Sequence, residues 1–236
     1  MRILNGQLVA FLGDSITQHL VAVSDWMETQ TDGLPPVGTY VVVDRHENRG
    51  WTKLLASRIH LSYPERTIRY LNAGIGGDSS RQMLARFDAD ILEHHPQWLV
   101  LSAGVVEVRR TYQPDREQDR VPLDEYRTNL FTMITRAQNA DIQVILLEPT
   151  PHARPVMDGP PCVTLEEVNT LTQQYAEVMR QVAHETGAGF VPLFEKFLKV
   201  EHRLKGKASL YADEVHLGSK GDLFYSQMVY QYLDSD

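Results

Sequence analysis

Short apolar runs alternate along the chain with longer amphipathic segments. Almost every residue in a run is apolar, which is typical of β-strands buried on both faces of a sheet. In the amphipathic segments apolar residues recur every three or four positions, as on one face of an α-helix. The runs predict strands at residues 7–12, 67–71, 98–102, 142–147 and 189–193. The amphipathic segments predict helices at residues 50–60, 80–94, 123–139, 165–186 and about 220–233.

The alternation of predicted strands and helices indicates the fold class. Strands that alternate with helices favour a parallel sheet with helices on both faces. We therefore predict an α/β protein with three layers, α/β/α, around a central five-stranded parallel sheet. Such sheets place their functional sites at the carboxyl ends of the strands. Three turns follow predicted strands directly, at Gly13, Asn72 and Gly104, and chemistry is expected there.

One long segment interrupts the alternation, at about residues 18–48. It contains Pro35-Pro36 and a β-prone stretch at residues 40–43. We interpret residues 1–236 as one domain with this segment as an insertion loop that shapes the pocket wall. Its tip, at residues 34–43, is apolar enough to contact a substrate or a second subunit, so a homo-oligomer stays open.

Composition and charge narrow the class of protein. A chain of 236 residues with 42% hydrophobic residues can bury a core without disulfides, and its one cysteine, Cys162, permits no internal disulfide. The formal net charge of −8 gives no hint of a nucleic-acid partner. No run approaches the ~20 apolar residues of a membrane span. The N-terminus lacks the pattern of a signal peptide, so a cytoplasmic location is expected.

The first turn carries a candidate nucleophile. Asp14 and Ser15 follow the first predicted strand, where a serine can be exposed above the sheet. Backbone N–H groups of the following turn then face the same point, which suits an anion. A second interpretation is that Asp14 and Ser15 only cap the next helix.

A second candidate group lies near the C-terminus. A serine hydroxyl needs an adjacent base at neutral pH, and histidine is the side chain best matched to that task. The imidazole must in turn be oriented by a third group. Asp213 and His216 are three residues apart, so one turn of chain can bring carboxylate and ring together. The alternative is a solvated turn with an incidental pair.

Taken together, these segments resemble the SGNH, or GDSL-like, hydrolase family from Phe11 to Gly221. The family's first block is matched by residues 13–17 and its last block by residues 213–216. Its second block resembles residues 72–78, in which Gly77 corresponds to a glycine that donates a backbone N–H. The resemblance implies a flavodoxin-like sheet, a Ser15-His216-Asp213 triad, and an oxyanion hole that includes the backbone N–H groups of Ser15 and Gly77.

The third block departs from the family pattern. The family has Gly-x-Asn-Asp after its third strand, and that asparagine side chain donates to the oxyanion. This chain has Val106 at the asparagine position, and a valine side chain has no N–H to donate. An arginine is a possible replacement. We favour Arg49, whose loop starts at the nucleophile, and we expect Arg109 and Arg110 to form surface salt bridges.

The resemblance implies a carboxylic ester hydrolase that works through an acyl-enzyme. Its substrate classes are acetylated sugars, short-chain aryl esters, lysophospholipids and acyl thioesters, and no metal or organic cofactor is implied. We expect Asp14 and Val106 beside the bound substrate. Loss of the asparagine motivates an alternative, a catalytically weakened protein that acts as a ligand-binding or regulatory module. Acyl transfer to an alcohol instead of water is a third reading.

Overall fold

The centre of the fold is a six-stranded sheet in the order β2-β3-β1-β4-β5-β6. The computed structural model describes residues 1–19, 41–43, 50–157, 159–160, 162–204 and 206–235. Five strands are parallel, as predicted, and β2 joins antiparallel to β3 at one edge. The strands are β1 (Leu8–Gly13), β2 (Val41–Val43), β3 (Arg69–Gly74), β4 (Trp98–Ser102), β5 (Gln143–Leu147) and β6 (Gly189–Val191).

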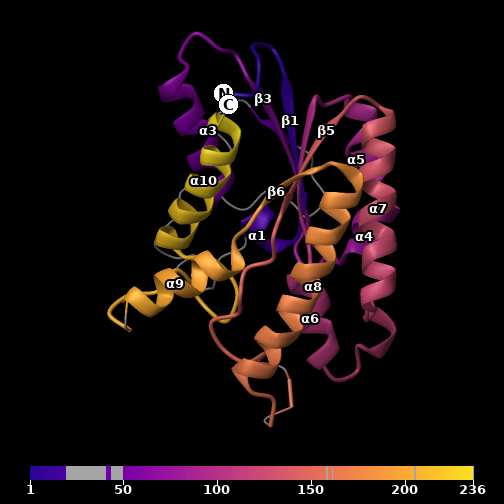
Figure 1. Cartoon of the computed structure of the whole chain (residues 1–236), viewed down its shortest axis with the longest axis vertical. Helices are drawn as coiled ribbons and strands as arrows, with labels where there is room; N and C mark the ends of the chain where they lie inside the picture. The colour runs from indigo at the N-terminus through magenta and orange to yellow at the C-terminus, as the bar shows by residue number, and fades with distance from the viewer. Residues whose placement is uncertain (20–40, 44–49, 158, 161, 205, 236) are drawn as a thin grey trace.

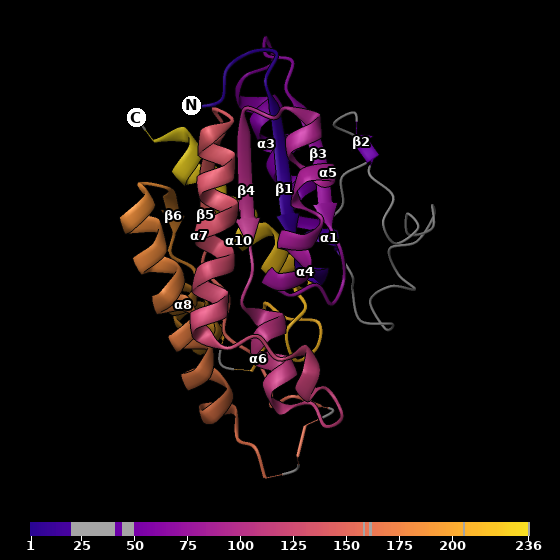
Figure 2. The same ribbon diagram turned by 90° about the vertical axis from the view of Figure 1, so that its right-hand side faces the viewer.

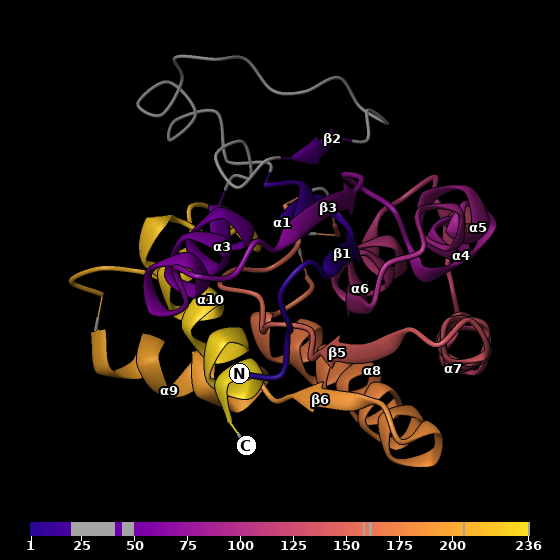
Figure 3. The same cartoon turned by 90° about the horizontal axis from the view of Figure 1, so that it is seen from above.

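Helices cover both faces of the sheet (Figures 1 and 3). On one face α3 packs against α10, with α9 beside them; on the other α7 packs against α8 and α4. The α-helices are α1 (Ser15–Gln18), α3 (Gly50–Ser62), α4 (Ser80–Ala85), α5 (Phe87–Asp90), α6 (Val105–Tyr112), α7 (Leu123–Asn139), α8 (Leu165–Thr186), α9 (Phe194–Leu204) and α10 (Ser219–Asp234). The described residues also contain the 3₁₀ turns η1 (Leu92–His94) and η2 (Glu117–Asp119).

The strand β1 shows how the sequence pattern specifies two cores. Leu8, Ala10 and Leu12 point into the core under α7 and α8. Val9 and Phe11 point into the core under α3 and α10. Because side chains alternate along a strand, a strand covered on both faces must be apolar at every position. This explains why β1 was recognisable in the sequence as a continuous apolar run from Leu8 to Leu12.

The strand order places the candidate site. β1 lies between β3 and β4. The chain adds β3 on one side of β1 and then crosses over to add β4 on the other side, so the strand order reverses at β1. In open α/β sheets the crevice at such a reversal, at the carboxyl ends of the strands, is where ligands bind. Figure 2 shows the arrowheads of β1 and β4 pointing toward α1 and α6. The turns after these two strands are those that carry Ser15 and Gly104.

The structure corrects three details of the predicted elements. The single helix predicted at residues 80–94 is broken into α4, α5 and η1, and the break falls at Arg86, whose φ is −104° and ψ 5°. The strand predicted at residues 67–71 is β3, which runs on to Gly74 because it pairs with β1 as far as Gly13. Helices α6 and α9 were not predicted.

Most of the insertion predicted at residues 18–48 lies outside the described residues. Within the described part, Val41–Val43 forms β2, which agrees with the β-prone character of that stretch. No described helix is long and apolar enough to cross a bilayer.

Candidate active site

Ser15 is placed by a tight turn between β1 and α1. Asp14 is the N-cap residue, and Ser15 is the first residue of the helix. Asp14 Oδ1 accepts the N–H of Ile16 at 2.9 Å, and Trp51 Nε1 donates to the Ile16 carbonyl oxygen at 3.2 Å. Asp14 therefore caps the helix, as one interpretation of the sequence proposed. Ser15 does something else, because its side chain reaches a partner 201 residues away in the sequence.

That partner is held in a short loop before α10. An antiparallel bridge between Tyr211 and Leu217 closes the loop. Asp213 Oδ1 accepts the backbone N–H groups of Val215 at 2.9 Å and His216 at 2.8 Å. Because one carboxylate oxygen is bound to its own loop, the other faces the imidazole. Asp213 Oδ2 lies 2.7 Å from His216 Nδ1.

The structure brings Ser15, His216 and Asp213 together in one hydrogen-bonded chain. His216 Nε2 lies 2.9 Å from Ser15 Oγ, and Nδ1 of the same ring faces Asp213. Ser15 is 9% exposed, and the His216 side chain is 16% exposed. The His216 ring therefore lies between a hydroxyl and a carboxylate and is partly exposed to solvent. This is the geometry that a nucleophile, a base and an orienting carboxylate require.

The environment keeps Asp213 ionised. Burial by itself raises the pKa of Asp213, but hydrogen bonds from the His216 ring and from the N–H groups of Val215 and His216 outweigh it. The resulting pKa is about 2. The carboxylate is thus negative at neutral pH and stabilises positive charge on the ring beside it.

The segment after β3 lies against the serine turn. A Cβ on Gly74 would lie 2.4 Å from the backbone N of Gln18, so a glycine is required for this close approach. Gln18 Oε1 accepts the N–H of Gly76 at 2.6 Å. Gly77 follows with a φ of 82°, in the left-handed region that favours glycine. The second block is in this way fixed beside α1.

Arg86, at the break between α4 and α5, links the same two segments. Its Nε donates to Asp78 Oδ2 at 2.7 Å and its Nη1 to Asp90 Oδ2 at 2.5 Å. Its Nη2 donates to the carbonyl oxygen of Gly13 at 3.4 Å. One guanidinium therefore joins the glycine segment to the end of β1. The sequence analysis did not identify this residue, because no local spacing pattern marks it.

The third block begins α6. Glu107 Oε2 accepts the N–H of Gly104 at 3.0 Å, and Glu107 Oε1 accepts the N–H of Ser80 at 2.6 Å. Burial raises the pKa of Glu107. Val106 is 6% exposed, so an apolar side chain is packed where the family has its asparagine. The Glu107 carboxylate fixes the start of α6 to the start of α4, only three residues after Gly77.

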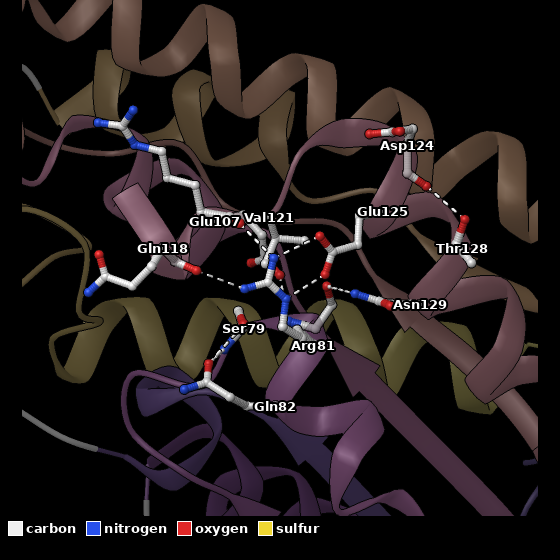
Figure 4. A network of polar contacts seen from close by, with 12 residues as sticks. Ser79, Arg81, Gln82, Glu107, Gln118, Val121, Asp124, Glu125, Thr128 and Asn129 are labelled. Carbon is white, nitrogen blue, oxygen red and sulfur yellow. Dashed lines mark hydrogen bonds and ion pairs between the residues drawn. The ribbon is translucent and has the colours of Figure 1, made fainter. Parts of the chain in front are cut away.

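A polar network continues outward from this junction (Figure 4). Asn129 Nδ2, on α7, donates to Ser80 Oγ at 3.1 Å. Arg81 Nε and Nη2 donate to the two carboxylate oxygens of Glu125 at 2.6 and 2.7 Å. Arg81 also donates to the carbonyl oxygens of Gln118 and Arg120. The network ties α4 and α7 together and holds the segment between α6 and α7.

The three candidate arginines have different positions. Arg49 lies outside the described residues. Arg109 pairs with Glu214 at 3.0 Å, and the Glu214 side chain is only 4% exposed, so the pair is not the surface salt bridge expected from the sequence. Arg110 donates through Nη2 to the carbonyl oxygen of Gly77 at 3.4 Å and through Nη1 to Gln113 Oε1 at 2.7 Å.

Asp14 is buried behind the serine. It is 1% exposed, and among the described residues its Oδ2 has no hydrogen-bond partner. Burial is the main cause that raises the pKa of Asp14 to about 7, and the negative charge of Glu107 adds to it. The hydrogen bond from Ile16 and the proximity of His216 act in the opposite direction.

A cavity of about 320 Å³ lies far from these residues. It is lined by the first residues of β4, β5 and β6, together with Arg2 and Tyr232. These are the amino ends of the strands, opposite the end that carries Ser15. Among the described residues no group of three or more His, Cys, Asp or Glu could hold a metal ion.

The geometry agrees with comparisons to known proteins. The sequence profile of the GDSL-like lipase/acylhydrolase family matches residues 11–222. The chain belongs to this family. An acetylxylan esterase of Geobacillus stearothermophilus is 27% identical to this SGNH hydrolase over 228 residues, with 96% of this chain and 94% of the relative covered. An isoamyl acetate-hydrolyzing esterase 1 homolog of Rattus norvegicus is 26% identical, with 78% of this chain and 74% of the relative covered.

Solved structures extend the likeness to the fold. The crystal structure of the Geobacillus stearothermophilus acetylxylan esterase superposes on this SGNH hydrolase with a TM-score of 0.78 and 25% identity, covering 100% of this chain and 98% of the other. Structures of that enzyme include catalytic mutants in which a serine, a histidine or an aspartate is replaced by alanine. The protein is a carboxylic ester hydrolase of the SGNH type.

Proposed function

We propose that this hydrolase cleaves small acetyl esters, with Ser15 as nucleophile, His216 as general base and Asp213 as the orienting carboxylate. One observation carries the proposal. His216 lies within hydrogen-bond distance of Ser15 Oγ on one side, at 2.9 Å, and of Asp213 on the other, at 2.7 Å. The stability of the fold does not require a partly exposed histidine between these two groups.

The reaction follows from this arrangement. His216 Nε2 takes the proton of Ser15 Oγ as the oxygen attacks the ester carbonyl carbon, and the carbonyl π electrons move onto its oxygen. Asp213 accepts the Nδ1–H and stabilises the imidazolium. The ring then gives its proton to the departing alcohol oxygen, which leaves an acyl-enzyme. Water, activated by the same ring, releases the acid and restores Ser15.

The tetrahedral intermediate carries a negative oxygen that requires hydrogen-bond donors. The backbone N–H groups of Ser15 and Gly77 are the donors we assign to it, since both segments meet at the end of β1. Val106 contributes none. In other hydrolases the loss of one such donor costs about 10²- to 10³-fold in turnover.

The choice of acetyl esters is supported by the relatives. Both kinds of curated relative are named for hydrolysis of acetate esters, one of acetylated xylan and one of isoamyl acetate. Among the substrate classes expected from the sequence, acetylated sugars and short-chain esters are therefore favoured over lysophospholipids and acyl thioesters.

The test is hydrolysis of p-nitrophenyl acetate, butyrate and octanoate, and of acetylated xylo-oligosaccharides, by the wild type and the Ser15→Ala variant. We expect acetate to be the best aryl ester and Ser15→Ala to lower kcat by at least about 10⁴-fold. Ser235→Ala, an exposed serine near the amino ends of the strands, serves as the matched control and should be unchanged. Equal rates for wild type and Ser15→Ala would disprove the nucleophile.

A second candidate function is supported by Val106 alone. A protein with a weakened oxyanion hole can bind an ester without turning it over. Background rates on every substrate, together with saturable binding of an acetylated sugar by the wild type, would favour this ligand-binding function.

A further inference from the structure

Helix α6 places a second residue above the position of the missing donor. Val106 and Arg110 are four residues apart, so they lie on the same face of the helix, one turn from each other. Long side chains on a helix lean back toward its N-terminus. Val106 leaves no polar group on this face of α6, and Arg110 is the next residue along it.

The contacts of Arg110 place its guanidinium at the glycine segment. Its Nη2 is 3.4 Å from the carbonyl oxygen of Gly77. The same nitrogen is the atom within 4 Å of the position that a Cβ on Gly77 would occupy, again at 3.4 Å. Gly77 is the residue whose N–H the proposed function assigns to the oxyanion. The Arg110 guanidinium therefore lies directly beside Gly77, at the edge of the proposed oxyanion hole.

The charge of Arg110 has no ion-pair partner among the described residues, unlike that of its neighbours on the same segment. Arg109 pairs with Glu214, Arg116 with Asp119, and Arg120 with Glu117. Arg110 instead uses two donors on neutral oxygens, of Gln113 and Gly77. A guanidinium has five N–H donors, so donors remain for a further acceptor.

The surroundings of Arg110 favour an incoming negative charge. Burial lowers the pKa of Arg110 and the positive charge of Arg116 lowers it further; Asp119 acts in the opposite direction, and Arg109 adds the smallest lowering effect. The guanidinium remains protonated, because arginine does not titrate in proteins. It is a positive charge held in partly desolvated, positive surroundings, and an oxyanion would relieve that repulsion.

Its position is also braced. Glu107 directly follows Val106 and lies one turn before Arg110 on α6. Its carboxylate accepts N–H groups from both Gly104 and Ser80. The start of α6 and the segment that follows Gly77 are therefore fixed to each other by one buried carboxylate. Donors that are fixed before the reaction need no reorganisation when charge develops on the substrate.

We propose that Arg110 is a catalytic residue that donates an N–H to the oxyanion in place of the asparagine side chain of the family. The inference rests on the proposed function. As Ser15 Oγ bonds to the carbonyl carbon and its proton passes to His216 Nε2, the carbonyl π electrons move to the oxygen. That oxygen accepts hydrogen bonds from Ser15 N–H, Gly77 N–H and the Arg110 guanidinium. When the alcohol leaves with the proton of His216, the carbonyl re-forms and the hydrogen bond from Arg110 weakens.

The test compares Arg110→Met, which keeps length and removes charge, with Arg110→Lys and with Arg127→Ala. Arg127 is an exposed arginine on α7 and is paired with Glu185, so its variant should retain wild-type kinetics. On p-nitrophenyl acetate we expect Arg110→Met to lower kcat about 100-fold with KM nearly unchanged. The kcat of Arg110→Lys should fall between the kcat of the wild type and that of Arg110→Met. Added millimolar guanidinium should restore part of kcat to Arg110→Met but none to Ser15→Ala.

Two results would overturn the inference. The first is a kcat for Arg110→Met within about threefold of the wild type. The second is a loss confined to KM without guanidinium rescue, which would make Arg110 a substrate anchor. Both are distinct from failure of the proposed function, which requires Ser15→Ala to keep wild-type rates. If Arg110→Met unfolds, judged by circular dichroism, Arg110→Lys decides: a lowered kcat together with weaker inhibition by a boronic acid supports Arg110 at the oxyanion, and a wild-type kcat or a KM change alone contradicts it.

Discussion

The guanidinium of Arg109 lies 3.0 Å from the carboxylate of Glu214, the residue that follows Asp213 in the loop of the candidate triad. The other oxygen of Glu214 accepts the N–H of Met157 at 2.7 Å. The loop is thus attached at one point to α6 and to the segment between β5 and α8. We therefore expect that the loss of these Glu214 contacts displaces His216, which lies two residues further along the chain.

Replacing Glu214 by glutamine removes one of two acceptors that are both in use. An amide offers one oxygen and places N–H groups against Arg109 or the Met157 N–H. We expect the free energy of unfolding to fall by about 1–3 kcal/mol and kcat to fall several-fold more than KM rises. Urea denaturation and steady-state kinetics measure both, with Glu166→Gln, an exposed glutamate on α8, as control. A variant that matches the control in both measurements would contradict the positioning role.

Gly77→Ala should damage activity as well as stability. Gly77 has a φ of 82°, so an alanine is strained by about 1–2 kcal/mol, and its Cβ would press on Arg110 at 3.4 Å. Gly187, the C-cap of α8, has a φ of 69° and nothing within 4 Å of a new Cβ. Gly187→Ala should therefore lose comparable stability and keep wild-type kcat. If both variants keep wild-type kcat, Gly77 is not part of the oxyanion hole.

Arg86→Met should be strongly destabilising at neutral pH. The Arg86 side chain is 15% exposed and faces Asp78 and Asp90, whose side chains are 12% and 3% exposed. Its removal leaves two uncompensated carboxylates, which costs about 3–5 kcal/mol. The loss should shrink toward pH 4, because burial raises the pKa of Asp78 and its carboxyl can then take up a proton. Arg127→Met, which breaks a pair exposed at 42% on both sides, should cost less than about 1 kcal/mol.

Asp14 should make the protein less stable as the pH rises from about 4 to about 7. Burial raises the pKa of Asp14 from 3.8 to about 7, so within this window the unfolded chain releases the proton while the native protein keeps it. The unfolded state then binds fewer protons, and the free energy of unfolding falls with pH. Above pH 7 the effect is constant.

Urea denaturation of the wild type and Asp14→Asn from pH 4 to pH 8 measures this contribution. Asparagine keeps an oxygen for the Ile16 N–H and cannot ionise, so the variant should lack that part of the slope. Asp213 acts in the opposite sense in a separate window, because its pKa is lowered from 3.8 to about 2 and its stabilisation disappears as the pH falls through that range. Parallel curves for the two proteins between pH 4 and pH 7 would show that Asp14 does not ionise differently on folding.

Sequence patterns predicted the five parallel strands, most clearly β1, β4 and β5, which are almost wholly buried. α8 was predicted with its observed bounds, since Thr164 caps its start and Gly187, in the left-handed region, ends it. α9 was missed although its buried Phe194 and Phe197 have helical spacing. The break at Arg86 had no signal in the spacing of apolar residues, which is the pattern that predicted the helix, because Arg86 is held by polar contacts with Asp78, Asp90 and Gly13.

The same distinction applies to the site. Asp213 and His216 were predicted as a pair because their spacing is local, and Ser15 was a candidate because it follows the first predicted strand. The resemblance to the family joined the three residues. The contact between Arg110 and Gly77 joins residues 33 apart in sequence and depends on how α6 packs against the glycine segment. Sequence reasoning favoured Arg49 because its loop starts at the nucleophile, and Arg49 lies outside the described residues. Helix geometry gave a clue, since Arg110 lies one turn from Val106, but α6 had not been predicted.

The hydrogen bond between Ser15 and His216 spans 201 residues, from the first strand of the sheet to the loop before its last helix. During synthesis the proposed nucleophile leaves the ribosome long before the proposed base does. If Ser15 and His216 have these roles, a nascent chain carries a serine that is not yet activated and does not form an acyl-enzyme before folding is complete. Reaction with an ester-like suicide inhibitor would consequently report on the completion of folding of the entire described chain, and not on any local part of it.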